Sequence, residues 1–115
     1  MVVTNSQERP VAVVKRYTFP NTLNQDGATT NWVADPPRVS ASRGDTVRWT
    51  VDDTSLNRQI EIRNVHGVFT NITCQGNVAT ATIKDDAVVG RHYVYRFFWG
   101  PDEAEGSSAP GVIIE

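Results

Sequence analysis

The sequence is poor in the residues on which metal and redox sites depend. It has one cysteine (Cys74), one methionine (Met1) and two histidines (His66 and His92). One cysteine excludes an intrachain disulfide. A blue-copper centre needs two imidazoles, a thiolate and a weak axial thioether, and neither an imidazole nor a thioether follows Cys74 closely. The sequence therefore predicts no metal and no cofactor, and Cys74, in an apolar alternation, is expected to be a small core residue.

Clusters of basic residues and long apolar runs are also absent. The only lysines are Lys15 and Lys84, the arginines are scattered, and the net charge is −2. This pattern argues against nucleic-acid and membrane partners. The first ten residues hold no apolar run of signal-peptide length, and nothing approaches a transmembrane span. We therefore expect a cytoplasmic location.

What is present is an alternation of apolar and polar residues typical of β-strands. At 115 residues the chain suits one domain, with a flexible N-terminal tail at 1–10 and a β-sandwich at 11–115. Three segments alternate most clearly, namely Thr46–Val51, Val78–Lys84 and His92–Trp99. No segment of helical length has a 3.6-residue period. Seven to nine short strands at this spacing predict a sandwich or a barrel.

Few residues stand out as chemical groups. Three groups of carboxylates are expected in turns, namely Asp52-Asp53, Asp85-Asp86 and, in an acidic loop at 100–108, Asp102-Glu103-Glu105. They could serve a hydrolase or a weak calcium site but are ordinarily solvated. The Arg43-Gly44-Asp45 tripeptide matches an integrin-binding motif, yet a turn before a strand explains it fully.

The tryptophans could form a sugar-binding platform. Trp49 and Trp99 share their strand faces with Val or aromatic neighbours, which favours a core position. Trp32, beside a loop, is expected to be the most exposed of the three and is the binding candidate.

Two sets of residues carry a family resemblance. Arg43–Trp49 and Gly90–Tyr95 resemble the cupredoxin superfamily. This resemblance implies a single Greek-key sandwich of the cupredoxin-like or immunoglobulin-like kind with seven to nine short strands, and it implies no function. The chain from about Asp45 to Glu115 resembles the DP-EP family of small bacterial β-sandwich proteins, through the Asp45–Asp53 strand, Gly67-Val68-Phe69, the aromatic strand Tyr93–Phe98 and the closing Ser108–Glu115.

The DP-EP resemblance implies self-cleavage at an Asp-Pro bond before the last strand, and self-association. There an aspartate would attack its own carbonyl carbon or activate a water at that carbon, and proline would be the leaving amine. This sequence has Ala109 before Pro110, so no carboxylate is available. The family's link between a lysine and the released aspartate has only Lys84 as its nearest candidate. The second Asp-Pro bond, Asp35-Pro36, is expected to end a strand.

Three hypotheses follow. The first is a DP-EP-like domain made inactive as a self-cleaving endopeptidase by Ala109 and acting as an intact module that self-associates. The second is a non-catalytic module on a copper-free cupredoxin-like sandwich, binding carbohydrate or protein through Trp32 and the loops, with the small-molecule ligand unknown. The third is an enzyme that uses turn carboxylates.

Overall fold

The computed structural model describes residues 7–18, 29–53, 57–104 and 110–115, and these contain strands and no helix. None of the described residues forms a helix long and apolar enough to cross a bilayer. The strands are β1 (Glu8–Thr18), β2 (Thr29–Asp35), β3 (Arg38–Ala41), β4 (Thr46–Val51), β5 (Ile60–Arg63), β6 (Phe69–Gln75), β7 (Val78–Ile83), β8 (His92–Val94), β9 (Arg96–Trp99), β10 (Asp102–Glu103) and β11 (Gly111–Ile114). The predicted all-β class is confirmed.

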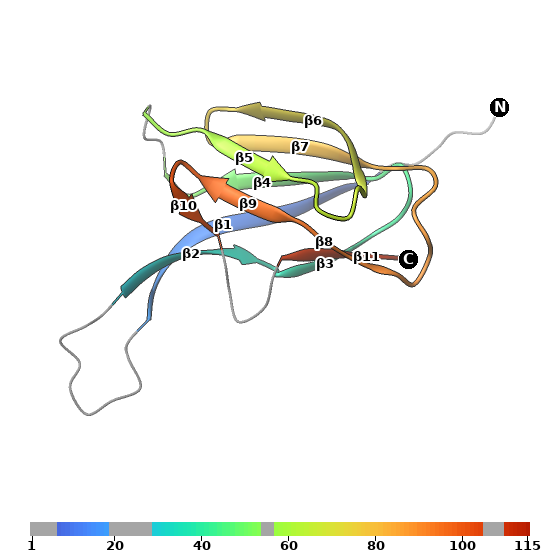
Figure 1. The fold of residues 1–115 in the computed structure, drawn as a ribbon, viewed down its shortest axis with the longest axis horizontal. Helices are drawn as coiled ribbons and strands as arrows, with labels where there is room; N and C mark the ends of the chain where they lie inside the picture. Colours follow the sequence, from blue (N-terminus) through green and yellow to red (C-terminus); the bar gives the residue numbers. More distant parts are fainter. Residues whose placement is uncertain (1–6, 19–28, 54–56, 105–109) are drawn as a thin grey trace.

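The strands form a two-layer sandwich. One layer is a five-stranded sheet in the order β2-β1-β4-β7-β6. The other consists of two three-stranded sheets, β10-β9-β5 and β3-β11-β8, which the chain joins by running from β8 into β9 through Tyr95. In Figure 1 the β1–β2 hairpin extends beyond the rest of the sandwich at the lower left.

The alternation read from the sequence decides which residues enter the core. In β4, Val47, Trp49 and Val51 are buried, and in β7 every second residue from Ala79 to Ile83 is buried. These residues face the second layer, which contributes its own buried row of Tyr93, Tyr95, Phe97 and Trp99, together with Val112 and Ile114 of β11. Burying side chains of this size stabilises the fold by about 1.5–3 kcal/mol each.

An aromatic cluster around Trp49 fills the centre of the sandwich. The ring centroid of Trp49 lies 5.3 Å from that of Phe69, 5.4 Å from that of Tyr95 and 6.1 Å from that of Phe97. The Trp49 indole N–H donates to the Tyr95 hydroxyl at 2.9 Å. The polar edge of this large ring is therefore satisfied inside the core, as burial requires.

Three boundaries differ from the sequence-based expectation. The predicted His92–Trp99 strand is divided at Tyr95 into β8 and β9, and β10 lies where an acidic loop was expected, so the described residues form eleven strands where seven to nine were expected. In addition, β1 begins at Glu8, within the segment expected to be a tail, because Glu8–Pro10 pairs in parallel with Thr46–Arg48.

Candidate functional site

The strand β11 has a hydrogen-bonded neighbour on each side. β11 lies between β3, to which it is parallel, and β8, to which it is antiparallel. Pro110 and Gly111, at the start of this strand, are buried. Two hydrogen bonds fix them: the Tyr95 N–H donates to the Pro110 carbonyl at 3.1 Å, and the Gly111 N–H donates to the Pro37 carbonyl at 2.8 Å. Ala109 itself lies outside the described residues.

A histidine packs directly against the entry to this strand. A Cβ added at Gly111 would lie 2.2 Å from the Nε2 atom of His92 and 2.9 Å from the Tyr93 carbonyl oxygen. Position 111 therefore requires glycine because of the limited space. The backbone conformation does not require it, because the φ of Gly111 is not in the left-handed region. Nε2 of His92 is buried and has no hydrogen-bond partner among the described residues. The sequence shows His92 as one of two lone histidines and gives no sign of this packing.

The residues weighed for metal or acid–base chemistry make structural contacts. Nδ1 of His66 accepts the Val94 N–H at 2.9 Å, and β8 is an edge strand of its sheet among the described strands. The Asp53 carboxylate accepts the indole N–H of Trp99 at 3.0 Å. In the described part of the chain, no three or more His, Cys, Asp or Glu side chains come together as a metal site.

Trp32 does not provide the exposed platform that was expected. It is 5% exposed, and the Lys15 ammonium lies 5.7 Å from the centroid of its ring. Its backbone forms a bridge with Ala104, which is also buried. Trp49 and Trp99 are fully buried, as predicted. The expectation that Trp32 is exposed for binding was wrong, because its strand face continues the inward row of Ala34.

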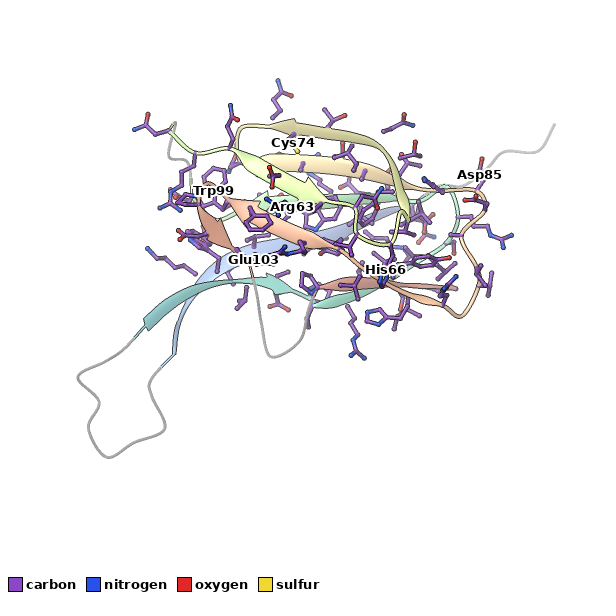
Figure 2. All side chains as sticks on the ribbon, in the orientation of Figure 1. Arg63, His66, Cys74, Asp85, Trp99 and Glu103 are labelled. Carbon is purple, nitrogen blue, oxygen red and sulfur yellow. The ribbon has the colours of Figure 1, made fainter. Side chains whose placement is uncertain are left out.

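Cys74 is exposed, and the expectation of a core position was wrong. Cys74 pairs with the buried Ala79 and so faces the second layer. However, β6 is an edge strand. A cavity of about 160 Å³, lined by Gln59, Ile60, Cys74 and Gly76, lies beside the thiol, which is therefore not covered by packed side chains. Figure 2 labels Cys74 on β6. Partial burial raises the pKa of the thiol.

Asp45, the last residue of the integrin-type tripeptide, is 3% exposed and serves the fold. Its carboxylate accepts the backbone N–H groups of Gln7 at 3.0 Å and Ser42 at 2.9 Å, and the Arg9 guanidinium at 3.1 Å. Burial alone would raise the pKa of Asp45, but these three donors outweigh it and lower the pKa. An aspartate so enclosed is not presented to a receptor.

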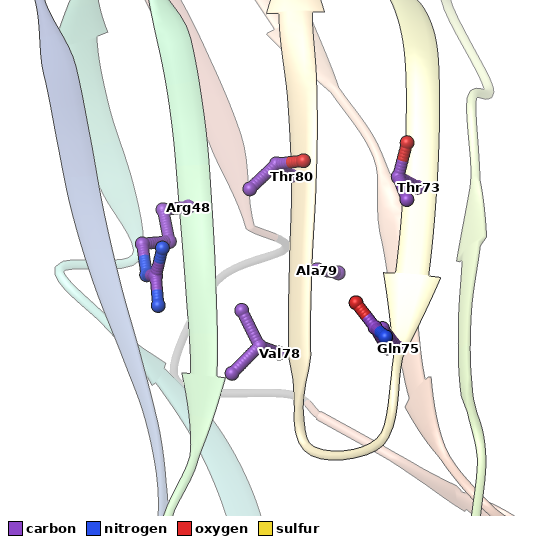
Figure 3. Close-up of a pocket in the computed structure, with 6 residues that line it drawn as sticks. All are labelled: Arg48, Thr73, Gln75, Val78, Ala79 and Thr80. Atoms are coloured by element: carbon purple, nitrogen blue, oxygen red, sulfur yellow. The ribbon is translucent and has the colours of Figure 1, made fainter.

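Two shallow grooves lie on the outer face of the five-stranded sheet. The first, of about 310 Å³, is lined by Arg48, Thr73, Gln75, Val78, Ala79 and Thr80 (Figure 3). The second, of about 420 Å³, is lined by Thr70, Asn71, Thr82, Ile83, Lys84, Asp85 and Asp86. Sequence reasoning missed both, although the polar threonines opposite each buried row were a visible signal of this face.

Comparison with family models and with curated proteins finds no match to this chain.

Proposed function

We propose that this chain is a DP-EP-like β-sandwich domain that remains uncut because Ala109 occupies the position of the reacting aspartate. The sequence resemblance from Asp45 to Glu115 supports the family, and the alanine methyl group supplies no nucleophile or base. The observation that carries the proposal is the burial of β11, the strand that would follow the cleaved bond. An intact chain keeps this strand covalently attached to the sandwich that it completes.

The burial of β11 also limits what cleavage would achieve in such a domain. Val112 is fully buried and Ile114 is 1% exposed. The strand is hydrogen-bonded on both sides, and beyond it the Glu115 N–H donates to the Ala41 carbonyl at 2.9 Å. A cut before Pro110 would therefore leave the segment bound. We propose that the module acts as a folded unit and not as an enzyme, in the cytoplasm and without a cofactor.

The experiment is to restore the carboxylate. We expect Ala109→Asp to produce, on incubation at neutral pH, a fragment beginning at Pro110 that intact-mass spectrometry identifies after denaturation. Ala109→Asn is the matched control, because it has the same shape without a carboxylate and should stay whole. A folded Ala109→Asp chain that never cleaves would contradict the family assignment. A break before Pro36 would have a different mass and would contradict the choice of site.

Self-association is part of the same proposal, since the family resemblance implies it. Sedimentation velocity over a range of protein concentrations tests it directly. A sedimentation coefficient that rises with concentration supports self-association, whereas a constant monomer value removes it from the proposal.

A binding module is the second candidate. The groove that crosses β4, β7 and β6 favours it, because this groove presents hydroxyl, amide and guanidinium groups from neighbouring strands (Figure 3). The buried Trp32 does not support the aromatic platform first expected for such a module.

A further inference from the structure

The outer face of the five-stranded sheet carries polar residues in regular rows. Directly opposite residues on neighbouring strands project from the same face of a sheet. Across β4, β7 and β6 the rows are Thr46–Thr82–Thr70, Arg48–Thr80–Thr73 and Thr50–Val78–Gln75. The face therefore presents hydroxyl and amide groups with few charges, and with methyl groups between them.

A β-bulge keeps the third strand in these rows. Between Thr70 and Thr73 the strand β6 gains one residue relative to β7, so both threonines pair with outward-facing residues. Without the extra residue, Thr73 and Gln75 would face the opposite side. Asn71, within the bulge, has a φ of 53°, a left-handed conformation that asparagine tolerates better than most residues. Bulges are common next to binding sites, where they redirect side chains.

The first groove has the composition of a small polar binding site. Of its six lining residues Arg48 alone is charged, and its side chain is 44% exposed. Its contact with Glu8 is long, at 4.0 Å, and both groups are solvated, so the guanidinium is only weakly neutralised. Figure 3 shows Arg48 on one side of the groove, Thr73 and Gln75 on the other, and Val78 and Thr80 between them.

The chemistry of the groove excludes several classes of ligand. No aromatic residue lines it, so a nucleobase would have no ring on which to stack. It lies on the face of the sheet and not on an edge, so a peptide could not add to it as a strand. Hydroxyl and amide groups beside a small apolar surface suit a sugar ring, and a guanidinium suits a carboxylate, which it can bind through two hydrogen bonds.

We propose that this groove binds a saccharide bearing carboxylate groups, such as a uronic acid unit of a polysaccharide. Arg48 binds the carboxylate, Thr73, Gln75 and Thr80 bind ring hydroxyls, and Val78 contacts the C–H face of the ring. The second groove carries Lys84 together with Asp85 and Asp86, whose net charge would repel an acidic ligand, so the site is confined to the first. This proposal rests on the binding-module candidate and is independent of residue 109.

The test is a heteronuclear NMR titration of the full chain with a short oligogalacturonate. A fully methyl-esterified oligogalacturonate is the matched ligand, because it has the same rings without charge. We expect the acid form to shift the amide signals of Arg48, Thr73, Gln75, Val78 and Thr80, and to bind at least about tenfold more tightly than the ester. Its affinity should fall as salt is added, because the contact is solvated.

Two variants assign the effect to named groups. Arg48→Gln should weaken binding about tenfold, and Thr80→Val, which keeps the shape and removes the hydroxyl, should weaken it by a smaller factor. Arg63→Gln is the control, since Arg63 is an exposed arginine on the other layer, paired with Glu61. Unchanged NMR spectra elsewhere verify folding.

Several results would overturn the proposal. These are the absence of shifts, shifts outside the groove, equal binding of acid and ester, or equal loss in Arg48→Gln and Arg63→Gln. A change of oligomeric state with shifts on this face would instead identify a second copy as the occupant, and would also overturn it. None of these results depends on cleavage of Ala109→Asp, so the two proposals fail separately.

Discussion

At the scale of single residues, Asp45 shows how one buried carboxylate joins distant parts of the chain. It accepts hydrogen bonds from Gln7 and Arg9, which precede β1 or lie within it, and from Ser42 in its own turn. The sequence indicated the turn, because Gly44 and Asp45 are typical of one, and Gly44 does have a φ of +82°. It gave no sign of the partners near residue 8, because that contact depends on the parallel pairing of β1 with β4.

We expect Asp45→Asn to lower the free energy of unfolding by about 2–4 kcal/mol at neutral pH, because the variant loses the charge and one acceptor. The pKa of Asp45 is lowered in the folded state from 3.8. Its contribution is therefore complete above the unfolded pKa and is lost as the pH falls through the folded pKa. Urea denaturation from neutral to acidic pH should show a shallower acid loss in Asp45→Asn than in the natural chain. Parallel curves would contradict this role.

For Tyr95 we expect the opposite pH dependence, in which the free energy of unfolding falls at high pH. Burial raises the pKa of Tyr95 to about 12 from 10.0, while the indole N–H of Trp49 lowers it slightly. Its stabilisation is complete below the unfolded pKa and is lost as the pH rises through the folded value. Tyr95→Phe should cost about 1–3 kcal/mol at neutral pH, because the Trp49 N–H loses its acceptor, and should reduce the alkaline loss of stability in denaturation experiments. If Tyr95→Phe loses as much stability at alkaline pH as the natural chain does, groups other than Tyr95 cause that loss.

The contact between Gly111 and His92 is testable by a double-mutant cycle. Gly111→Ala should destabilise the fold by about 1–3 kcal/mol through overpacking, because its methyl group would meet the imidazole ring. In a His92→Ala background the same change should cost less, although the Tyr93 carbonyl still limits the space. Equal costs in both backgrounds, measured by denaturant titration, would show that the ring is not the obstacle.

At the scale of strands, the alternation of residues predicted which faces are buried but not which strands are partners. The segment His92–Trp99 alternates without interruption, yet β8 pairs with β11 and β9 pairs with β5. No local pattern in the sequence marks this change of partner at Tyr95. β10 was missed because acidic residues are poor strand formers, and here they are held by Arg58–Asp102 at 2.6 Å and Arg96–Glu103 at 2.8 Å.

Strand β6 provides a prediction about Cys74. Because β6 is an edge strand and the thiol is exposed, a chromogenic aromatic disulfide should label Cys74 in the native protein without denaturant. The reaction should be slower than that of a free thiol at the same pH, because the pKa of the thiol is raised and less thiolate is present. Labelling only after unfolding, followed by absorbance, would show that the second layer covers Cys74.

At the scale of the whole molecule, the all-β class followed from the two-residue period and the absence of a helical one. The arrangement of layers did not, since it depends on the parallel pairs β1–β4 and β3–β11 between segments far apart in sequence. The candidate sites divide in the same way. Ala109-Pro110 was visible as a local motif, whereas the groove of Arg48 and Thr73 requires the register of three strands.

We propose above all that this sandwich remains one uncut chain with β11 in place. The most direct measurement is intact-mass spectrometry of the natural chain after prolonged incubation at neutral pH, under denaturing conditions that release any bound fragment. We expect a single species with the mass of the whole chain. A pair of species divided between Ala109 and Pro110 would contradict it, because cleavage would then proceed without the carboxylate on which the account depends.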